Sequence, residues 1–254
     1  MKRKIEINGV KSAVDVVIPL RKRPLNDYSW KEIHEISKSG RAKELFQVEK
    51  TKDITVNGKR YKAVILGFNH DDLADGSGKA GITFGLMECL DKKYPMNETG
   101  TNIGGWKNSE MRRFLSEDIF NSLEKDLKAV ISSVIKVTNI GGDSFKIEKT
   151  TDKLFLFSIS EIYRPVVYQR GRGNGCDVLG WMNCSLKPEG GQYSYFRKKS
   201  HVLKRINKSL CWWWLRSPCS NSRKYNLFFH VKGNGNSSGI CADNEGGIVF
   251  GFAI

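Results

Sequence analysis

Two apolar blocks bracket a polar stretch near the end of the sequence. The first block, residues 211–215, contains three adjacent tryptophans, and the second block, residues 248–254, carries no charge. Three consecutive tryptophans cannot all face water, so both blocks are predicted to be buried strands. The stretch between them, 219–246, is rich in Asn, Ser and Gly. Because strands are expected to hold it at both ends, it is predicted to be a displayed surface and not a disordered linker.

Helical periodicity appears in three places upstream of these blocks. The string Ser29-Trp30-Lys31-Glu32 is a capping-box pattern, and it predicts a helix that ends at Gly40. A second helical region is predicted to begin with Asn108 as its N-cap and to continue, as one or two helices, to residue 130. Another capping box, from Ser158 to Glu161, predicts a short third helix.

Alternating apolar positions predict antiparallel strands between and after these helices. Residues 52–68 alternate around Asn57-Gly58, the residue pair that favours a tight hairpin turn. Further strands are predicted at 131–138 and 145–149, joined through Gly141-Gly142.

These elements predict one mixed domain of the α+β class, with two main helices packed on small antiparallel sheets. The domain is expected to span residues 25–254, since the sequence shows no internal repeat and no second hydrophobic core. Residues 1–24 alternate weakly, with short strands predicted at 5–10 and 14–20. They are interpreted as an N-terminal β arm that serves as an edge hairpin, a tether or an oligomerisation element.

The end of the sequence resembles a known family. The string Trp213-Trp214-Leu215-Arg216-Ser217-Pro218, the polar stretch after it and the closing Gly247-Ile248-Val249-Phe250-Gly251-Phe252 are similar to the variable region of C-type-lectin-fold proteins that retroelements diversify in gut bacteria and their phages. The resemblance continues through 64–71, 101–112 and 151–158, and so covers roughly 27–254. The closing block departs from the family's usual Gly-Leu-Ala-Pro-Gly-Phe because it lacks the proline. The resemblance implies a C-type-lectin (formylglycine-generating-enzyme-like) fold with a variable region at about 212–254.

It also implies a non-enzymatic ligand-binding protein whose hypervariable surface, at about 219–246, recognises a protein or glycan partner on a bacterial surface. In this family a retroelement rewrites adenines, so Asn codons drift to codons for residues such as Ser, Asp, Tyr, Cys, His and Arg. Lys224, Lys232 and Glu245 are not reached in this way and are interpreted as framework, or as a sign that diversification is partial or extinct. The variable side chains are expected to point outward from a fixed backbone. The residues identified in this way as ligand-binding are Cys219, Ser220, Asn221, Arg223, Tyr225, His230, Asn234, Asn236, Ser238, Ile240, Cys241, Asp243 and Asn244.

Four residues, Trp106, Trp213, Trp214 and Arg216, are expected to form the scaffold below this surface. Strand alternation places Trp212 and Trp214 on one face and Trp213 on the other. Arg216 is predicted to tie the start of the loops to a carboxylate or to carbonyls, with binding of an acidic ligand as the alternative. Trp106 is interpreted as a core anchor and not as a ligand platform.

The chain is strongly basic, with 42 Lys and Arg against 27 Asp and Glu and a formal net charge of +15. Such an excess favours partners such as nucleic acid, an acidic polysaccharide or an anionic cell surface. One basic cluster precedes Pro24, and the other runs from Arg197 to Lys208 directly after Tyr193, Tyr195 and Phe196. We interpret the clusters as a solvated rim, and the alternative is a nucleic-acid-binding accessory protein.

The six cysteines show no Cys-x-x-Cys spacing and are interpreted mostly as thiols. No apolar stretch is long enough for a secretory signal or a membrane span. The protein is therefore expected to be made in a bacterial cytoplasm and, if it acts outside, to reach a phage virion or the cell surface by another route.

Sequence signatures of nucleophilic, phosphate-binding or metal-dependent catalysis are absent, so no enzyme activity and no cofactor are expected. Two alternatives stay open. His70-Asp71-Asp72, with Asp75, has the oxygen ligands of a calcium site, although a polar turn is the preferred interpretation. The same fold also hosts oxidases that use specific cysteine pairs or histidine clusters. Neither the ligand nor the oligomeric state, a possible homo-oligomer, follows from the sequence.

Overall fold

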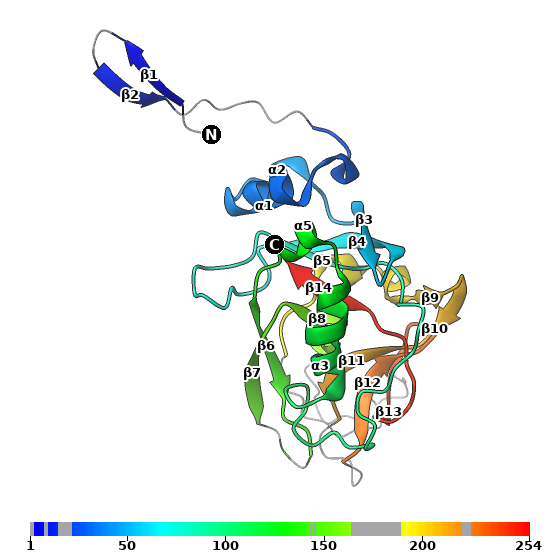
Figure 1. Ribbon diagram of the computed structural model, residues 1–254. Coiled ribbons are helices and arrows are strands. Elements are labelled where there is room, and N and C mark those ends of the chain that lie inside the picture. The colour runs from blue at the N-terminus through cyan, green and yellow to red at the C-terminus, as the bar shows by residue number, and fades with distance from the viewer. Residues whose placement is uncertain are drawn as a thin grey trace.

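The computed structural model describes residues 3–7, 10–14, 22–142, 144, 146–163, 189–219 and 225–254 (Figure 1). Helices and antiparallel sheets are both present, which confirms the predicted α+β class.

The largest sheet has five strands in the order β3-β4-β5-β14-β8. They are β3 (Thr51–Val56), β4 (Lys59–Phe68), β5 (Ile82–Leu86), β14 (Phe250–Ala253) and β8 (Leu154–Leu156). The predicted hairpin is β3–β4, and its turn residues Asn57 and Gly58 have φ angles of 49° and 75°, as a type I′ turn requires. β14 pairs with β5 on one side and β8 on the other, so the last strand of the sequence lies inside this sheet (Figure 1).

The tryptophan block begins a separate three-stranded sheet in the order β11-β12-β13. Its strands are β11 (Trp213–Pro218), β12 (Leu227–Val231) and β13 (Ser237–Cys241). Both terminal apolar blocks are therefore strands, as predicted. The sequence pattern did not predict β12 and β13, because small and polar residues dominate that stretch.

Three two-stranded sheets complete the strands of the described residues. The predicted hairpin after the helical region is β6 (Val134–Asn139) with β7 (Ile147–Asp152). Another is β9 (Lys204–Ile206) with β10 (Ser209–Cys211). The N-terminal hairpin is β1 (Arg3–Ile7) with β2 (Val10–Val14), so both strands begin and end several residues earlier than the sequence predicted.

The first and last predicted helices begin where expected. α1 (Trp30–Lys38) and α6 (Ile159–Ile162) both have capping boxes, at Ser29 and Ser158. Gly40 follows α1 with a φ of 73°, which ends the helix at low steric cost. α2 (Ala42–Leu45) and 3-10 turns at Leu25–Asp27, Ser194–Arg197 and Lys199–Val202 are additional short elements.

The middle helical region differs from its prediction in two ways. Ser109, not Asn108, is the N-cap, and its hydroxyl accepts a hydrogen bond from the Arg112 N–H. The region is also divided into α3 (Glu110–Phe114), a π-helical turn at Leu115–Ile119, α4 (Phe120–Ser122) and α5 (Lys125–Lys128). An extended Leu123 separates α4 from α5 while its side chain stays buried, so the apolar period survives a break in the helix.

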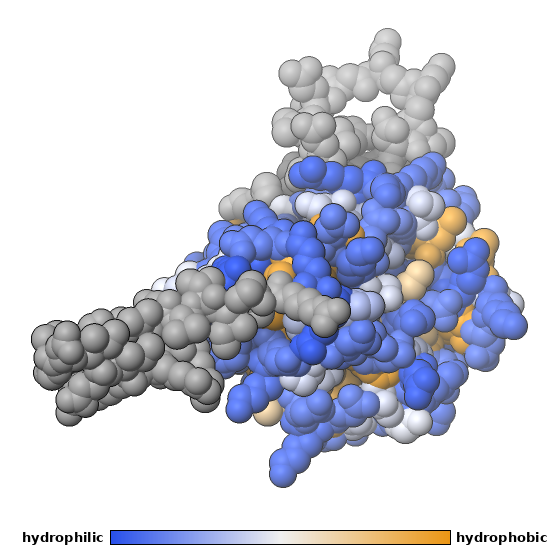
Figure 2. All heavy atoms as spheres, turned by 90° about the horizontal axis from the view of Figure 1, so that it is seen from above, coloured by the Kyte–Doolittle hydropathy of each residue, from blue (hydrophilic) through white to orange (hydrophobic). Residues whose placement is uncertain are grey.

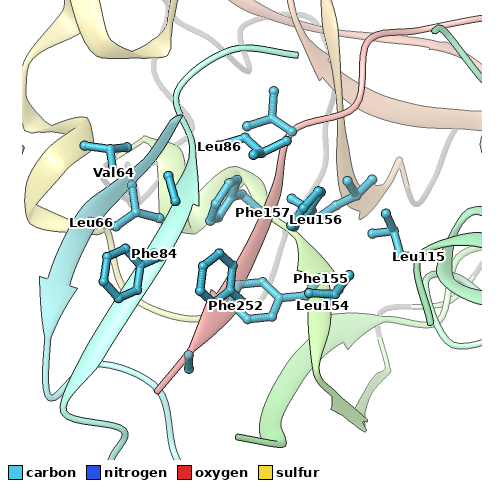
Figure 3. Packing of buried hydrophobic residues seen from close by; sticks show 14 of the residues in the cluster. Val64, Leu66, Phe84, Leu86, Leu115, Leu154, Phe155, Leu156, Phe157 and Phe252 are labelled. Atoms are coloured by element: carbon cyan, nitrogen blue, oxygen red, sulfur yellow. The ribbon is translucent and has the colours of Figure 1, made fainter. Parts of the chain in front are cut away.

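Part of the core lies between α1 and the large sheet. Phe84 of β5 and Phe252 of β14 stack with ring centroids 5.3 Å apart, and Trp30 of α1 contacts both rings edge-on. Figure 3 shows that Phe84 and Phe252 project from neighbouring strands toward the same space. Aromatic residues from both ends of the sequence thus close a single core.

The face of the molecule that carries α1 and α2 is mostly polar (Figure 2). Figure 2, a view of the end that carries α1 and α2, shows a largely hydrophilic face with small hydrophobic areas. None of the helices described is long and apolar enough to cross a membrane. Cys89, Cys211 and Cys241 are free thiols, whereas Cys176 and Cys184 lie outside the described residues.

Candidate ligand-binding surface

The tryptophans of β11 form a rigid base for the loops that follow. Trp213 and Trp214 are fully buried, and their indole N–H groups donate to the carbonyls of Val202 (2.9 Å) and Tyr94 (2.8 Å). Trp212 and Trp214 contact each other, with centroids 5.0 Å apart, while Trp213 packs against Phe157. The predicted alternation of the three rings is confirmed.

Arg216 joins β11 to α6 and β6 through a buried ionic network. Its guanidinium makes two hydrogen bonds to the Glu161 carboxylate, at 2.5 and 3.0 Å, and one to Thr138 Oγ1 at 3.0 Å. Lys136 continues the network, since its Nζ lies 2.8 Å from Glu161 Oε1 and 2.6 Å from Asp71 Oδ1. Arg216 therefore holds the start of the loops to a carboxylate and to backbone carbonyls, as the sequence predicted.

The network holds three buried acids in different environments. Burial alone would raise the pKa of Asp71, but the charge of Lys136 brings it down to about 2. The Arg216 and Lys136 charges likewise overcome the effect of burial on Glu161 and lower its pKa. Burial dominates for Glu189 and raises its pKa to about 6.

The acids near His70 serve this network or nearby side chains. Besides Lys136, Asp71 accepts hydrogen bonds from Thr83 and Tyr193, and Asp72 pairs with Lys79 at 2.7 Å. The His70 ring stacks on Tyr193. Within the described ranges no three His, Cys, Asp or Glu side chains are grouped to hold a metal ion.

Asn102 fixes both ends of the loop that follows β11. Its Nδ2 donates to the carbonyls of Cys219 (3.0 Å) and Leu227 (2.9 Å), and its own N–H donates to the Tyr225 carbonyl (2.9 Å). Its Oδ1 accepts from the Gly142 N–H at 3.0 Å. One buried side chain thus joins the entry and the exit of this loop to the β6–β7 turn.

Trp106 is a second anchor below the loops. It is fully buried, and its indole Nε1 donates to Asp152 Oδ2 at 3.0 Å. It lies inside the core, as the sequence predicted.

Seven of the predicted ligand-binding residues reach solvent. Tyr225, Asn234, Asn236, Asp243 and Asn244 are exposed, and Ile240 and Cys241 are half-buried. They stand on the β12–β13 hairpin and on the loops beside it. Ser220, Asn221 and Arg223 lie outside the described residues.

The expectation that every variable side chain points outward is wrong for Cys219, His230 and Ser238, which are all buried. His230 of β12 and Ser238 of β13 are paired in the sheet. The centroid of the His230 ring lies 5.1 Å from that of the Trp212 ring. Strand alternation therefore turns these two side chains toward the tryptophans. Cys219 is enclosed because its N–H and its carbonyl are bonded to Leu227 and Asn102.

His230 makes the stability of this surface sensitive to pH. Burial, with a smaller effect of Lys232, lowers the pKa of His230 from 6.5 to about 4. Between these two pH values the unfolded chain therefore binds more protons at His230 than the folded protein does. The contribution of His230 to the free energy of unfolding is fully present above pH 6.5 and decreases as the pH falls toward 4. We expect the His230 contribution to fall by about 2 kcal/mol between pH 7.5 and pH 5, measured by urea denaturation.

His230→Gln is expected to remove this loss, whereas His34→Gln, at a half-buried position of α1, is expected to keep it. Glu189 acts in the opposite sense, because an acid with a raised pKa gives stability that is present below pH 4.5 and lost as pH rises through 6. The test is therefore the difference between variant and wild type. An unchanged pH dependence in His230→Gln would contradict the assignment.

A surface groove adjoins the exposed loops, and sequence reasoning missed most of it. Its lining comes from the loop before α3, the β6–β7 hairpin and Tyr225, which are far apart in the sequence. No local motif marks such a site. In the folded protein the Gly142 N–H donates to Asn102 Oδ1, which brings two of these segments together.

Residues 80–250 match a protein family described as a domain of unknown function (DUF6273). The chain belongs to the DUF6273 family. The matched region includes β11, β12, β13, Asn102 and the groove, and it leaves α1, β3 and β4 outside. No curated protein matches the chain. No solved structure matches it.

Proposed function

We propose that this DUF6273 protein is a non-enzymatic ligand-binding protein with a C-type-lectin-like fold. Its exposed loops between β11 and β14 would contact a protein or glycan on a bacterial surface. One observation carries the proposal. The loops expose four polar side chains, those of Asn234, Asn236, Asp243 and Asn244. The strand β11, which precedes these loops, is anchored by the fully buried side chains of Trp213, Trp214 and Arg216. A fixed base with exchangeable polar side chains is how binding surfaces tolerate sequence change.

Diversification by a retroelement is part of the same proposal. The exposed Asn and Asp residues belong to the set that adenine rewriting produces, while the buried His230 and Ser238 mark positions where change would disturb the base. Lys232 and Glu245 are exposed and stay framework residues in this proposal.

Combined alanine substitution of Asn234, Asn236, Asp243 and Asn244 is expected to change the free energy of unfolding by less than about 1 kcal/mol, because exposed side chains contribute little to stability. The same variant should lose binding to intact bacterial cells, measured by flow cytometry with labelled protein over a panel of Gram-negative and Gram-positive strains. The matched control replaces the exposed Lys31, Glu35, Lys38 and Lys43 of α1 and α2 by alanine and should bind as wild type does. A stability loss of several kcal/mol, or equal binding by both variants, would refute the proposal.

Nucleic acid binding is the alternative, and the structure weakens its sequence basis. Lys204 is buried, with its Nζ bonded to the carbonyls of Leu86 (3.0 Å) and Met87 (3.1 Å). Tyr195 and Phe196, which precede the basic cluster, are buried as well and are not available for base stacking. Binding to random DNA that falls steeply with salt would favour this alternative over surface recognition.

A further inference from the structure

A groove of about 670 Å³ lies beside the exposed loops, at the end of the molecule away from α1. Figure 1 shows the β6–β7 turn at this end. The side chains used in the argument are Ile103, Lys107, Asn108, Ile140, Glu148 and Tyr225, which all line the groove. Its volume lies in the range of small-molecule sites.

Exposed apolar side chains gather at this groove. Five large apolar residues are exposed in the described part of the chain, and two of them, Ile103 (64 %) and Tyr225 (43 %), line the groove. Apolar side chains concentrated at a concave site indicate a contact surface, whereas single scattered ones do not.

Three backbone N–H groups at the groove already donate to groups of the protein. The N–H of Ile103 donates to Thr101 Oγ1, that of Gly141 to Asn139 Oδ1, and that of Gly142 to Asn102 Oδ1. A peptide that binds by adding a strand needs free backbone groups, so these loops do not favour that mode. A ligand in the groove is therefore expected to bind mainly to the side chains of the lining residues.

The polar side chains of the groove supply both donors and acceptors. Lys107 Nζ and Glu148 Oε2 lie 3.2 Å apart and join the loop before α3 to β7. The Lys107 side chain is 54 % exposed and that of Glu148 is 22 % exposed, so both can take a further partner. Asn108 adds an amide with donor and acceptor atoms. Each hydroxyl group on a sugar ring is both a donor and an acceptor, so it can bond to a carboxylate, an amide or an ammonium group.

Tyr225 supplies an aromatic ring beside these polar side chains. A sugar ring has one face of C–H groups and an edge of hydroxyls, so it buries its apolar face against an aromatic ring while its hydroxyls bond to polar side chains. We propose that the groove binds a sugar ring of a surface glycan, with Tyr225 as the stacking partner and Lys107, Asn108 and Glu148 as the hydroxyl partners. This inference rests on the proposed function and names its ligand class. Apart from Tyr225, these residues lie outside the variable stretch, so the hydroxyl partners are constant whereas the stacking partner belongs to the changeable part.

The test titrates the ¹⁵N-labelled full chain with single pyranoses: glucose, galactose, mannose, N-acetylglucosamine, N-acetylgalactosamine and L-rhamnose. At least one sugar is expected to shift the amide signals of Gly104, Gly141 and Gly142, with a Kd on the order of millimolar. Tyr225→Ala and Glu148→Gln should each weaken this binding about tenfold, and Leu210→Ala, an exposed apolar residue outside the groove lining, should leave it unchanged. Amide spectra of the variants report whether they fold.

The inference is overturned if no sugar shifts these amides, if the shifts occur elsewhere, or if the two groove variants bind as wild type does. Its failure differs from failure of the proposed function. One outcome is that cell binding depends on Asn234, Asn236, Asp243 and Asn244 while no sugar binds at the groove. This outcome would support the proposed function and contradict the groove as a glycan site. The proposed function itself would be contradicted if substitution of those four residues left cell binding unchanged.

Discussion

Replacement of Arg216 by methionine is expected to lower the free energy of unfolding by about 3–5 kcal/mol. The reason is that Glu161 is almost fully buried and receives two hydrogen bonds from this guanidinium, so the substitution leaves a buried carboxylate with half of its compensating charge. The measurement is urea denaturation at pH 7 followed by far-UV circular dichroism.

The matched control is Arg41→Met. Arg41 also pairs with a glutamate, Glu44, at 2.9 Å, but the two side chains are 38 % and 60 % exposed. An exposed pair contributes little, so this change should cost less than about 1 kcal/mol. Equal losses in the two variants would show that the buried network does not hold β11 in place.

Trp214→Ala is expected to cost about 3–5 kcal/mol, as truncation of a large buried aromatic residue does. The change removes a fully buried ring and also the hydrogen bond from its Nε1 to the Tyr94 carbonyl, which joins β11 to the loop before α3. Urea denaturation followed by circular dichroism avoids a signal that depends on the missing tryptophan.

Trp212→Ala is the control within the same block. Trp212 is only partly buried, although it contacts both Trp214 and His230. Its loss should cost less than half as much as that of Trp214. The opposite order would mean that Trp212, and not the fully buried Trp214, supplies most of the packing on this face.

The sequence predicted the elements whose signals are local. The capping boxes at Ser29 and Ser158 and the Asn57-Gly58 turn each specify a backbone geometry within four residues, and all three are found. The prediction of a helix through Leu123 was wrong, because the backbone is extended at this residue. The apolar residues keep a helical spacing there because their side chains are buried. Periodicity records which side chains face the core, not whether the hydrogen bonds continue.

The candidate surface was predictable only in part. Apolar blocks and Asn-rich composition located the loops and the buried tryptophans, but β12 and β13 turned His230 and Ser238 inward against that expectation. Nothing in the sequence near Asn102 indicates that its amide bonds Cys219 and Leu227, more than 100 residues away. Contacts of this kind depend on the folded topology, which a linear pattern does not contain.

The position of β14 has a consequence for how the loops can vary. β14 follows them in the sequence, yet it occupies an interior place in the five-stranded sheet between β5 and β8. A frameshift or a stop codon within the loops would delete this strand and expose the aromatic core that Phe252 closes. Such truncated products are expected not to fold, so under the proposed diversification only versions with an intact reading frame would give a folded protein.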